Sequence, residues 1–459
     1  MATETNQLTA AKQLANFLTR LRFSDLPDDV VHAAKRALLD TLGAGILGAA
    51  TEEGRRAAAA VSDLDQSDRI TIWGTAARAG PATAALVNGT AAHARELDDF
   101  GGCGHPGAVV VPAAMAAAEA IGGVNGSDLL TAIVAGYEVS ARVTDALGGY
   151  AAHNAQGWHS TGTCGTFGAA VAAAKLLSLD SERMAWAIGL AGTFTGGIWA
   201  FLVDGAMSKR LHPGKAAESG VTAAYLAQRA FTGPTHIFEA AWGGFLSTYA
   251  PKDSDDTALT SDLGEEFRIL RSGFKPYASC RGVHSSLDAL FKLREAHGFA
   301  AVDVERIVVT SHPSKMQMVG NSNVTTMLDA QMSLPYGLAV ALLSSDASLA
   351  QYTPERMRSP EVHAAVRSVQ IVTDPHISPD EEPTVEVHLR DGRYYRDQVS
   401  IALGAPENPL SDEALTEKVR HLVALVFPTA QTEALIETVW EAEKLVTIDY
   451  FAKLLARQG

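Results

Sequence analysis

Segments rich in alanine and glycine, with apolar residues at a helical period, fill the first 266 residues of this chain. In "SDLPDDVVHAAKRALLDTLGAGILGA", apolar residues recur at intervals of three and four from Val30 to Leu42, the spacing of an amphipathic helix. The segment "GSDLLTAIVAGYEVSARVTDALGG" repeats this plan. Small residues let helix axes approach closely, so these segments predict a compact, all-helical domain over residues 1–266.

Capping residues predict where these two helices begin. Ser24, followed by Pro27 and two acids, is typical of the start of the first helix, and Ser127 or Asp128 of the start of the second. One short extended piece, "ITIW" at residues 70–73, interrupts the helical pattern.

The composition changes after about residue 266. "VERIVVTSHP", "SVQIVTDP" and "TVEVHLRDGRYYRDQVS" are β-branched and partly alternating, and the third contains Asp391-Gly392, a hairpin signal. Helical segments, "SSLDALFKLREAHG" and "SLPYGLAVALL", lie between them. We expect a smaller α+β domain over residues 267–402. Residues 403–459 return to helix behind a capping Ser411 and should pack back on the first domain, which makes the fold class mainly α.

Length and charge limit the classes of function. A chain of 459 residues suggests two domains. The net charge is −15 (37 basic minus 52 acidic residues) and no block of lysines or arginines occurs, which argues against nucleic-acid and membrane partners. Three cysteines without paired spacing and a polar start, "MATETNQ", predict a cytoplasmic protein. The most apolar run is broken by Pro112 and Glu119 and falls short of the ~20 residues that span a bilayer.

The segment "ELDDFGGCGHPG", from Glu96 to Gly107, gathers three carboxylates, a cysteine and a histidine around four glycines. It could be a metal site, an acid–base site or a polar turn. Structural zinc needs four ligands in paired spacings, and Cys103 with His105 alone does not supply them, so we predict no metal. Asp98 and Asp99 either orient the bend or a histidine, or cap nearby backbone N–H groups.

A second glycine-rich segment, "GTCGTFGAAVAAAKLL", precedes a helix but follows no strand, so a dinucleotide site is not expected. Two readings of Gly162, Gly165 and Gly168 stay open. The helix N-terminus receives a carboxylate or phosphate, or the glycines only permit close packing.

Two basic segments are typical of anion clamps, although ordinary ion pairs at a helix start would look the same. They are "MSKRLHPGKAA", just before a helix, with Lys209, Arg210, His212 and Lys215, and "FKPYASCRGVHSS", with Lys275, Arg281 and His284.

Histidine is the usual general acid or base near neutral pH. His105 and His159 lie in or after glycine-rich bends, where a side chain can face a cleft, and are the candidates here. Four other histidines sit in ordinary helical contexts and are expected to be structural: His32, His297, His363 and His421.

Six stretches, taken together and in this order, resemble the MmgE/PrpD family over about residues 30–400. They are "LVNGTAAHARELDD", "GHPGAVVVPAAMAAAEA", "GWHSTGTCGTFGAAVAAAKLLSLD", "KRLHPGKAAESGVTAAYLAQRAFTGP", "FKPYASCRGVHSSLDA" and "DAQMSLPYGLAVALL". The family includes 2-methylcitrate dehydratases, cis-aconitate decarboxylases and iminodisuccinate epimerases. The resemblance implies a large helical domain built from both chain ends, a smaller α+β lid domain and a homodimer. It also implies that the protein uses neither a metal nor an organic cofactor.

The resemblance also implies which residues form the active site. It places four catalytic residues in the cleft: His105, His159, Lys209 and Lys275. From the acidic, glycine-rich and basic segments themselves, we expect the substrate-binding residues around them to be Glu96, Asp98, Asp99, Phe100, Thr161, Arg210, His212, Arg281 and His284.

Three positions depart from the decarboxylase branch of the family. Glu96 stands in place of an aspartate, Phe100 in place of a threonine, and Met318 near the place of a lid tyrosine. These departures count against cis-aconitate decarboxylation and select no alternative.

Every substrate of the family is a di- or tricarboxylate, so a base must move a proton and fixed cations must hold carboxylates. We expect a cofactor-independent lyase that dehydrates a 2-methylcitrate-like substrate, with Lys209 and Lys275 as the clamp. Alternatives are an epimerase or isomerase of an iminodisuccinate-like dicarboxylate, a cis-aconitate-type decarboxylase, and, in another class, a non-catalytic carboxylate-binding protein. Which histidine is the base stays open.

Overall fold

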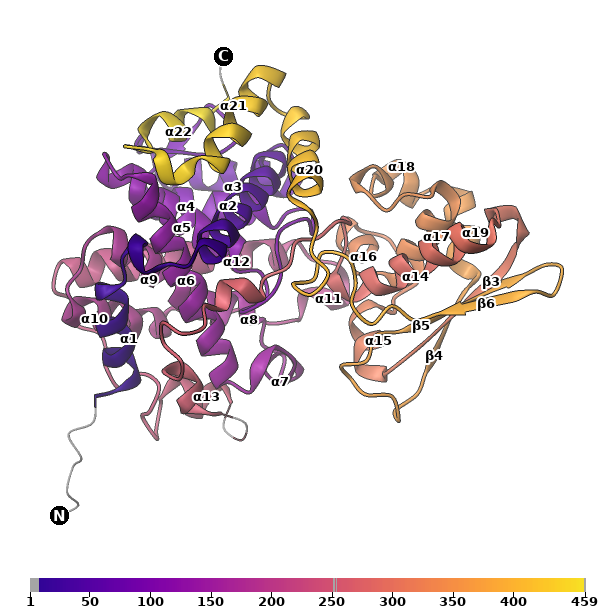
Figure 1. Ribbon diagram of the computed structural model, residues 1–459, viewed down its shortest axis with the longest axis horizontal. Coiled ribbons are helices and arrows are strands. Elements are labelled where there is room, and N and C mark those ends of the chain that lie inside the picture. The colour runs from indigo at the N-terminus through magenta and orange to yellow at the C-terminus, as the bar shows by residue number, and fades with distance from the viewer. Residues whose placement is uncertain (1–7, 251, 253, 458–459) are drawn as a thin grey trace.

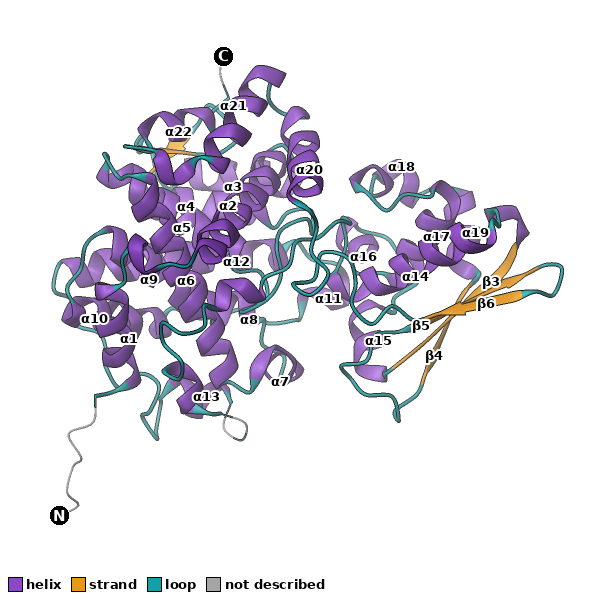
Figure 2. Ribbon diagram, in the orientation of Figure 1, coloured by secondary structure: helices purple, strands orange, loops and turns teal. Residues whose placement is uncertain are grey.

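The computed structural model describes residues 8–250, 252 and 254–457. A larger helical part lies beside a smaller part that holds a four-stranded sheet (Figure 1). The strands of that sheet gather on one side of the smaller part and its helices on the other (Figure 2). One large buried cluster takes residues from Ala10 to Phe274 and again from Leu410 to Leu455, and a second runs from Val283 to Leu389. The predicted fold class, mainly α, is confirmed.

The first stretch of the helical part contains thirteen α-helices within the described residues. They are α1 (Ala10–Arg20), α2 (Asp28–Ala49), α3 (Glu52–Ser62), α4 (Pro81–Ala92), α5 (Gly107–Ile121), α6 (Gly126–Ala146), α7 (Gly149–Ala155), α8 (Ser160–Thr163), α9 (Gly165–Leu176), α10 (Ser181–Thr193), α11 (Phe201–Asp204), α12 (Ser208–Gln228) and α13 (Phe245–Tyr249).

Glycines explain how these helices come so close. A β-carbon on Gly48 of α2 would lie 1.8 Å from the carbonyl oxygen of Ala91 in α4. One on Gly220 of α12 would lie 2.4 Å from Cβ of Ala169 in α9. Helices that pack this closely need glycine at the point of contact, because a β-carbon there would clash with the neighbouring helix. The close helix packing expected from the sequence is confirmed.

Both predicted helix starts are wrong by a few residues. Helix α2 begins at Asp28 with Pro27 as its N-cap, while Ser24 lies in a separate 3₁₀ turn, Phe23–Asp25. Helix α6 is capped by Asn125, whose side chain accepts a hydrogen bond from the backbone N–H of Asp128. Asparagine is as good an N-cap as serine or aspartate, so residue type alone could not locate this start.

The smaller part is built on a sheet with strand order β4-β3-β5-β6. Strand β3 (Val304–Ser311) pairs in parallel with β4 (Val369–Thr373) and antiparallel with β5 (Thr384–Leu389), which forms a hairpin with β6 (Tyr394–Asp397). Gly392 takes a φ of 90° in the hairpin turn, as the Asp-Gly signal predicted. The helices of this part are α14 (Arg281–His297), α15 (Pro313–Val319), α16 (Met327–Gln331), α17 (Leu334–Ser344), α18 (Pro354–Met357) and α19 (Pro360–Arg367).

The predicted extended piece at 70–73 contributes β1 (Ile70–Thr71), which pairs antiparallel with β2 (Arg78–Ala79). This two-stranded ribbon lies within the helical part and is separate from the four-stranded sheet of the smaller part.

The chain end returns to the helical part through α20 (Asp412–Ala424), α21 (Thr429–Trp440) and α22 (Asp449–Leu454). A β-carbon on Gly43 of α2 would lie 2.9 Å from Cγ1 of Val419 in α20, which shows how tightly the two ends meet. Ser411 caps α20 as predicted. The domain boundaries at residues 266 and 402 stay predictions.

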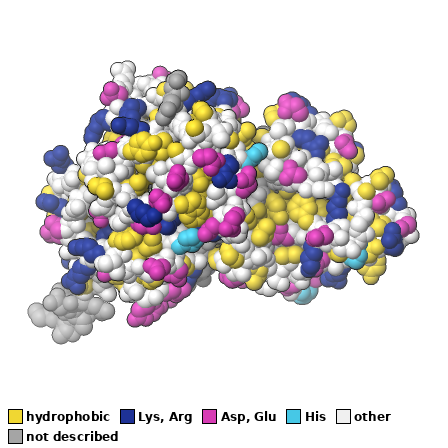
Figure 3. Space-filling view, turned by 45° about the horizontal axis from the view of Figure 1, so that its top comes forward, with side chains coloured by type: hydrophobic (Ala, Val, Ile, Leu, Met, Phe, Trp, Pro, Cys, Tyr) yellow, Lys and Arg dark blue, Asp and Glu magenta, His cyan; other side chains and the backbone are white. Residues whose placement is uncertain are grey.

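No helix in the described part of the chain combines the length and the apolar character needed to cross a membrane. On the face shown in Figure 3, basic and acidic side chains are interspersed and do not gather into a basic patch.

Candidate active site

The acidic segment from Glu96 to Gly107 follows α4 and turns into the protein. His93 is the C-cap of α4, and Glu96 then takes a left-handed φ of 51°, which is uncommon outside glycine. Gly101 and Gly104, with φ of 127° and 109°, let the chain double back. A backbone conformation of this kind costs about 1–3 kcal/mol and is kept only where neighbouring contacts hold the residue in place. Ion pairs with three cations hold Glu96 in this way.

Glu96 lies at the centre of what we call the ionic cluster, formed with Lys209, Arg210 and Lys275. Its Oε1 accepts from Lys209 and Arg210, and its Oε2 lies 3.0 Å from Nζ of Lys275. All four side chains are at most 2% exposed. Burial alone would raise the pKa of Glu96, but these three cations together hold it well below its ordinary value.

A second group, the histidine cluster, consists of His93, Asp98, His105 and His159. Oδ2 of Asp98 lies 2.8 Å from Nδ1 of His93 and 3.3 Å from Nδ1 of His105. The ring centroids of these two histidines are 4.3 Å apart, and that of His159 is 6.4 Å from each. The three rings therefore lie close together.

Hydrogen-bond partners determine the tautomer of His105. Its Nδ1 lies 2.9 Å from the backbone carbonyl oxygen of Asp99, which can only accept, so Nδ1 carries a proton. Burial, aided by the charge of Lys275, lowers the pKa of His105 and favours the neutral ring. A neutral His105 then presents a bare Nε2, which is the form that a general base requires.

Lys209 links the two clusters. Besides its contact with Glu96, its Nζ lies 3.0 Å from Nε2 of His93. Burial lowers the pKa of Lys209 to about 8, so this ammonium gives up its proton more readily than an exposed lysine does.

The two neighbouring aspartates have different roles, which decides between the two readings left open above. Asp98 orients two histidines, whereas Oδ1 of Asp99 accepts from the N–H of Gly107 at 2.9 Å and Oδ2 from the hydroxyl of Tyr137 at 2.7 Å. Burial raises the pKa of Asp99 to about 8, so it is protonated at neutral pH. Asp99 therefore stabilises the start of α5.

His159 and Thr161 flank the start of α8 beside the histidine cluster. Nδ1 of His159 lies 2.9 Å from Nδ1 of His212, which brings this predicted residue into the site. Burial, reinforced by Lys209, lowers the pKa of His159 well below its ordinary value. Oγ1 of Thr161 is buried and has no hydrogen-bond partner among the described residues, which leaves it free for a ligand.

The remaining predicted residues have other partners. Arg281 lies 3.3 Å from Oε1 of Glu382, and its guanidinium carbon is 5.3 Å from the ring centroid of Phe100. Nε2 of His284 donates to the carbonyl oxygen of Ser279 at 3.1 Å. Across the described residues, no hydrogen bond or ion pair joins Arg281 or His284 to the ionic cluster.

The first basic segment is divided by its helix. Helix α12 begins at Ser208, so the segment lies inside the helix and not before it. Lys209 and Arg210 are buried, whereas the side chain of Lys215 is 61% exposed and pairs with Glu218 at 2.6 Å. The position of Lys209 and Arg210 favours the anion-clamp hypothesis, whereas Lys215 forms an ordinary surface ion pair.

The glycines around α8 and α9 favour close packing over an anion site. A β-carbon on Gly162 would lie 2.1 Å from the carbonyl oxygen of Gly196, and one on Gly168 would lie 2.5 Å from that of Gly136. Both contacts require glycine whatever binds nearby.

His93, Asp98 and His105 have ligand atoms within 4.8 Å of one another, as a metal site would need. The donor set does not fit a cation, because Nε2 of His93 accepts from Lys209 and Nζ of Lys275 lies 3.8 Å from Asp98. Two buried ammonium groups would repel a metal ion. Activity without a metal stays a prediction.

Sequence reasoning missed His93 and Gln331. His93 lies in the quoted segment "LVNGTAAHARELDD", three residues before Glu96, and that spacing was the available signal. Gln331 accepts from Arg210 at 2.9 Å and donates to the carbonyl oxygens of Arg95 and Ala278, which ties α16 to the ionic cluster.

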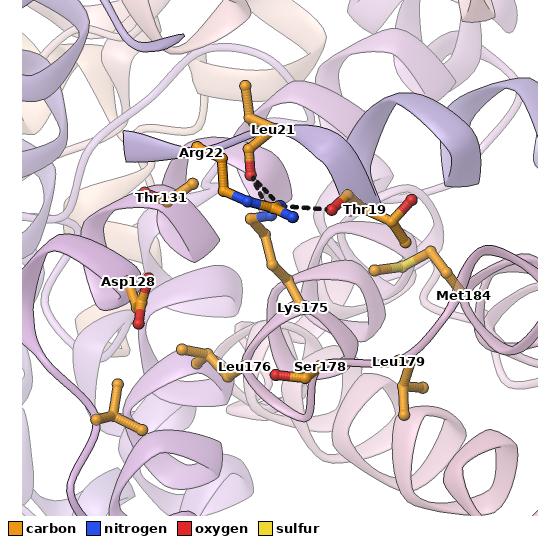
Figure 4. Close-up of a pocket in the computed structure, with 11 residues that line it drawn as sticks. Thr19, Leu21, Arg22, Asp128, Thr131, Lys175, Leu176, Ser178, Leu179 and Met184 are labelled. Carbon is orange, nitrogen blue, oxygen red and sulfur yellow. Dashed lines mark hydrogen bonds between the residues drawn. The ribbon is translucent and has the colours of Figure 1, made fainter. Parts of the chain in front are cut away.

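A cavity of about 310 Å³ opens elsewhere, among α1, α6 and α9 (Figure 4). There Lys175 donates to the carbonyl oxygens of Leu18 and Leu21. None of the predicted site residues lines it.

Comparison with known proteins places this chain in a family. Residues 12–257 match the MmgE/PrpD N-terminal domain and residues 277–442 the MmgE/PrpD C-terminal domain. The cis-aconitate decarboxylase-like protein oryM of Aspergillus oryzae is 30% identical over 97% of this chain and 96% of its own length. The cis-aconitate decarboxylase of Homo sapiens is 29% identical over 97% and 94%, and that of Aspergillus terreus 25% over 96% and 95%. The chain belongs to the MmgE/PrpD family.

Proposed function

We propose that this protein is a cofactor-independent lyase that acts on a small di- or tricarboxylate. The observation that carries the proposal is the contact between the ionic cluster and the histidine cluster through Lys209 in one buried site. Fixed cations hold carboxylates and stabilise developing charge, while a neutral histidine accepts a proton.

The balance of charge supports an anionic substrate. Lys209, Arg210 and Lys275 are three cations, and Glu96 and Asp98 are two anions, so these five side chains together carry one surplus positive charge. Asp99 is protonated at neutral pH and adds nothing. A substrate carboxylate would neutralise the surplus.

Dehydration is the reaction that uses the most of this site. Nε2 of His105 takes a proton from a carbon next to a carboxylate, and the ammonium of Lys209 gives a proton to the leaving hydroxyl. The C–H and C–O bonds break, a C=C bond forms, and one water leaves. A 2-methylcitrate-like hydroxy acid is therefore the first substrate to test.

Decarboxylation of a cis-aconitate-type substrate is the second candidate, and the names of the three relatives described above favour it. In this reaction the substrate loses CO2, and a side chain of the site must then deliver one proton to the carbanion that remains. Epimerisation of an iminodisuccinate-like dicarboxylate would use the same base twice, to remove and to return a proton.

A panel of substrates in deuterated water, followed by NMR, tests these reactions. The panel holds 2-methylcitrate, citrate, cis-aconitate and chiral iminodisuccinate. Alkene formation supports dehydration, CO2 loss supports decarboxylation, and inversion with deuterium uptake supports epimerisation. No turnover and no exchange with any of them would contradict the proposal, as would activity abolished by a chelator.

Lys209→Ala tests the clamp in the same assay. We expect a lower kcat/KM with the fold intact, and an unchanged kcat/KM would show that Lys209 does not contact the substrate. We also propose a cytoplasmic homodimer, which light scattering and cell fractionation test.

A further inference from the structure

Two histidines face each other, nitrogen to nitrogen, beside the proposed active site. Nδ1 of His159 lies 2.9 Å from Nδ1 of His212, and the ring centroids are 5.1 Å apart. A single proton lies between two hydrogen-bonded nitrogens, so one of them donates and the other accepts. The pair therefore ties the tautomer of His159 to that of His212.

The surroundings hold this pair in place. The backbone N–H of His159 donates to the carbonyl oxygen of Gly197 at 3.0 Å. A β-carbon on Gly197, whose φ is 126°, would lie 3.2 Å from Nδ1 of His212. Trp199 and Phe201 pack edge-on against the His159 ring, with centroids at 5.3 and 5.8 Å. A side chain at position 197 would press on the His212 ring.

Charged and titratable groups around the pair keep both rings neutral. Lys209 lies one turn before His212 on α12, and His105 and His93 face His159 from across the site. Burial, reinforced by Lys209, lowers the pKa of His159 well below its ordinary value and that of His212 to about 4. Two neutral rings then share one proton at Nδ1.

We propose that His212 is a positioning residue that donates its Nδ1–H to His159 and so keeps the proton of His159 on Nε2. His212 is partly exposed, so water can donate to the bare Nε2 that this arrangement leaves on it. The inference rests on the proposed function, in which His105 presents the bare nitrogen. His105 and His159 then offer one acceptor and one donor between them.

The two histidines have separate roles in this arrangement. Nε2 of His105 takes the proton from the substrate carbon, and Nε2–H of His159 donates a hydrogen bond to the negative charge that develops. His159 keeps its proton throughout, so no proton passes along the His159–His212 pair.

NMR of protein labelled with ¹⁵N-histidine tests the proposal, because long-range correlations report which ring nitrogen carries the proton. In the wild type we expect Nε2–H on His159 and Nδ1–H on His105. In His212→Phe we expect His159 to lose its single tautomer and kcat to fall about 10²-fold, the lower end for acid–base catalysis, with KM nearly unchanged. His212→Asn, whose amide can donate to His159, should restore the tautomer and part of kcat.

A second variant and a control keep the test decisive. Gly197→Ala disturbs the pair without removing a titratable group and should produce the same change at His159. His297→Phe alters a ring stacked on Tyr395 at 3.7 Å in the smaller part and should leave His159 unchanged. Protonation of His159 at Nδ1 in the wild type, or unchanged signals in both site variants, overturns the proposal. The NMR measurement needs no substrate, so its failure is distinct from failure of the substrate panel.

Discussion

The ionic cluster and the histidine cluster occupy one buried site but accommodate burial in opposite ways. Glu96, Lys209, Arg210 and Lys275 keep their charges because they pair with one another. The histidines stay neutral because burial and nearby cations disfavour a further positive charge. Fixed charges suit the binding of carboxylates, and neutral rings suit the movement of protons. In the proposed function the two tasks therefore fall to different side chains, and Lys209 takes part in both.

The largest expected effect comes from removing the base. His105→Gln keeps a side chain of similar size that cannot take up a proton, so we expect kcat/KM to fall about 10²–10⁴-fold while the free energy of unfolding changes little. Steady-state kinetics and urea unfolding measure the two quantities. His297→Gln, remote from the site, should be neutral in both. Activity within about tenfold of the wild type in His105→Gln would move the base elsewhere.

Removing one cation tests whether the ionic cluster depends on pairing. Lys275→Met leaves a carboxylate oxygen of Glu96 buried without its partner, and the free energy of unfolding should fall by about 3–5 kcal/mol. Lys215→Met breaks an exposed pair with Glu218 and should cost about 0–1 kcal/mol. Urea unfolding of both variants gives the comparison. Equal losses of unfolding free energy in the two variants would show that burial of the Lys275–Glu96 ion pair does not affect its contribution to stability.

A pH series tests the neutral carboxyl of Asp99 at the start of α5. The pKa of Asp99 is raised from 3.8 to about 8, so its contribution to stability is complete below pH 3.8 and is lost as pH rises through about 8. Relative to Asp99→Asn, the free energy of unfolding should fall by up to about 1.4 kcal/mol per pH unit between these values. Urea unfolding at several pH values measures it. Parallel curves for the two proteins would mean that Asp99 is ionised in the folded protein.

The smallest effect is expected at Thr161, whose buried hydroxyl has no partner among the described residues. If the substrate supplies that partner, Thr161→Val should weaken binding by about 1 kcal/mol, seen as a rise in KM without loss of stability. Thr166→Val is the matched control, because its hydroxyl already donates to the carbonyl oxygen of Gly162. The same KM in wild type and Thr161→Val would exclude this contact.

The sequence predicted the helical packing, the hairpin and most of the side chains that meet at the site. It did not separate Lys209 from Lys215, because the segment was placed before its helix and its residues were not assigned to faces. Six residues along a helix turn a side chain by 600°, so the two lysines point in different directions. Once the start at Ser208 is known, that difference follows.

The role of each aspartate and of His93 could not be read from residue types. Asp98 and Asp99 are neighbours in the chain and both are fully buried, yet one contacts two imidazoles and the other a backbone N–H and a tyrosine. These partners come from the end of α4, the loop before α5, the start of α5 and the middle of α6, and only the folded chain brings them together.

The C-terminal return has a consequence for how this protein is made. Lys418 of α20 contacts Asp40 of α2 and donates to the carbonyl oxygen of Leu97, the residue after Glu96. The ribosome delivers α20 only after the whole of the smaller part. The wall of the candidate site is therefore unfinished until α20 has been made and has packed against α2.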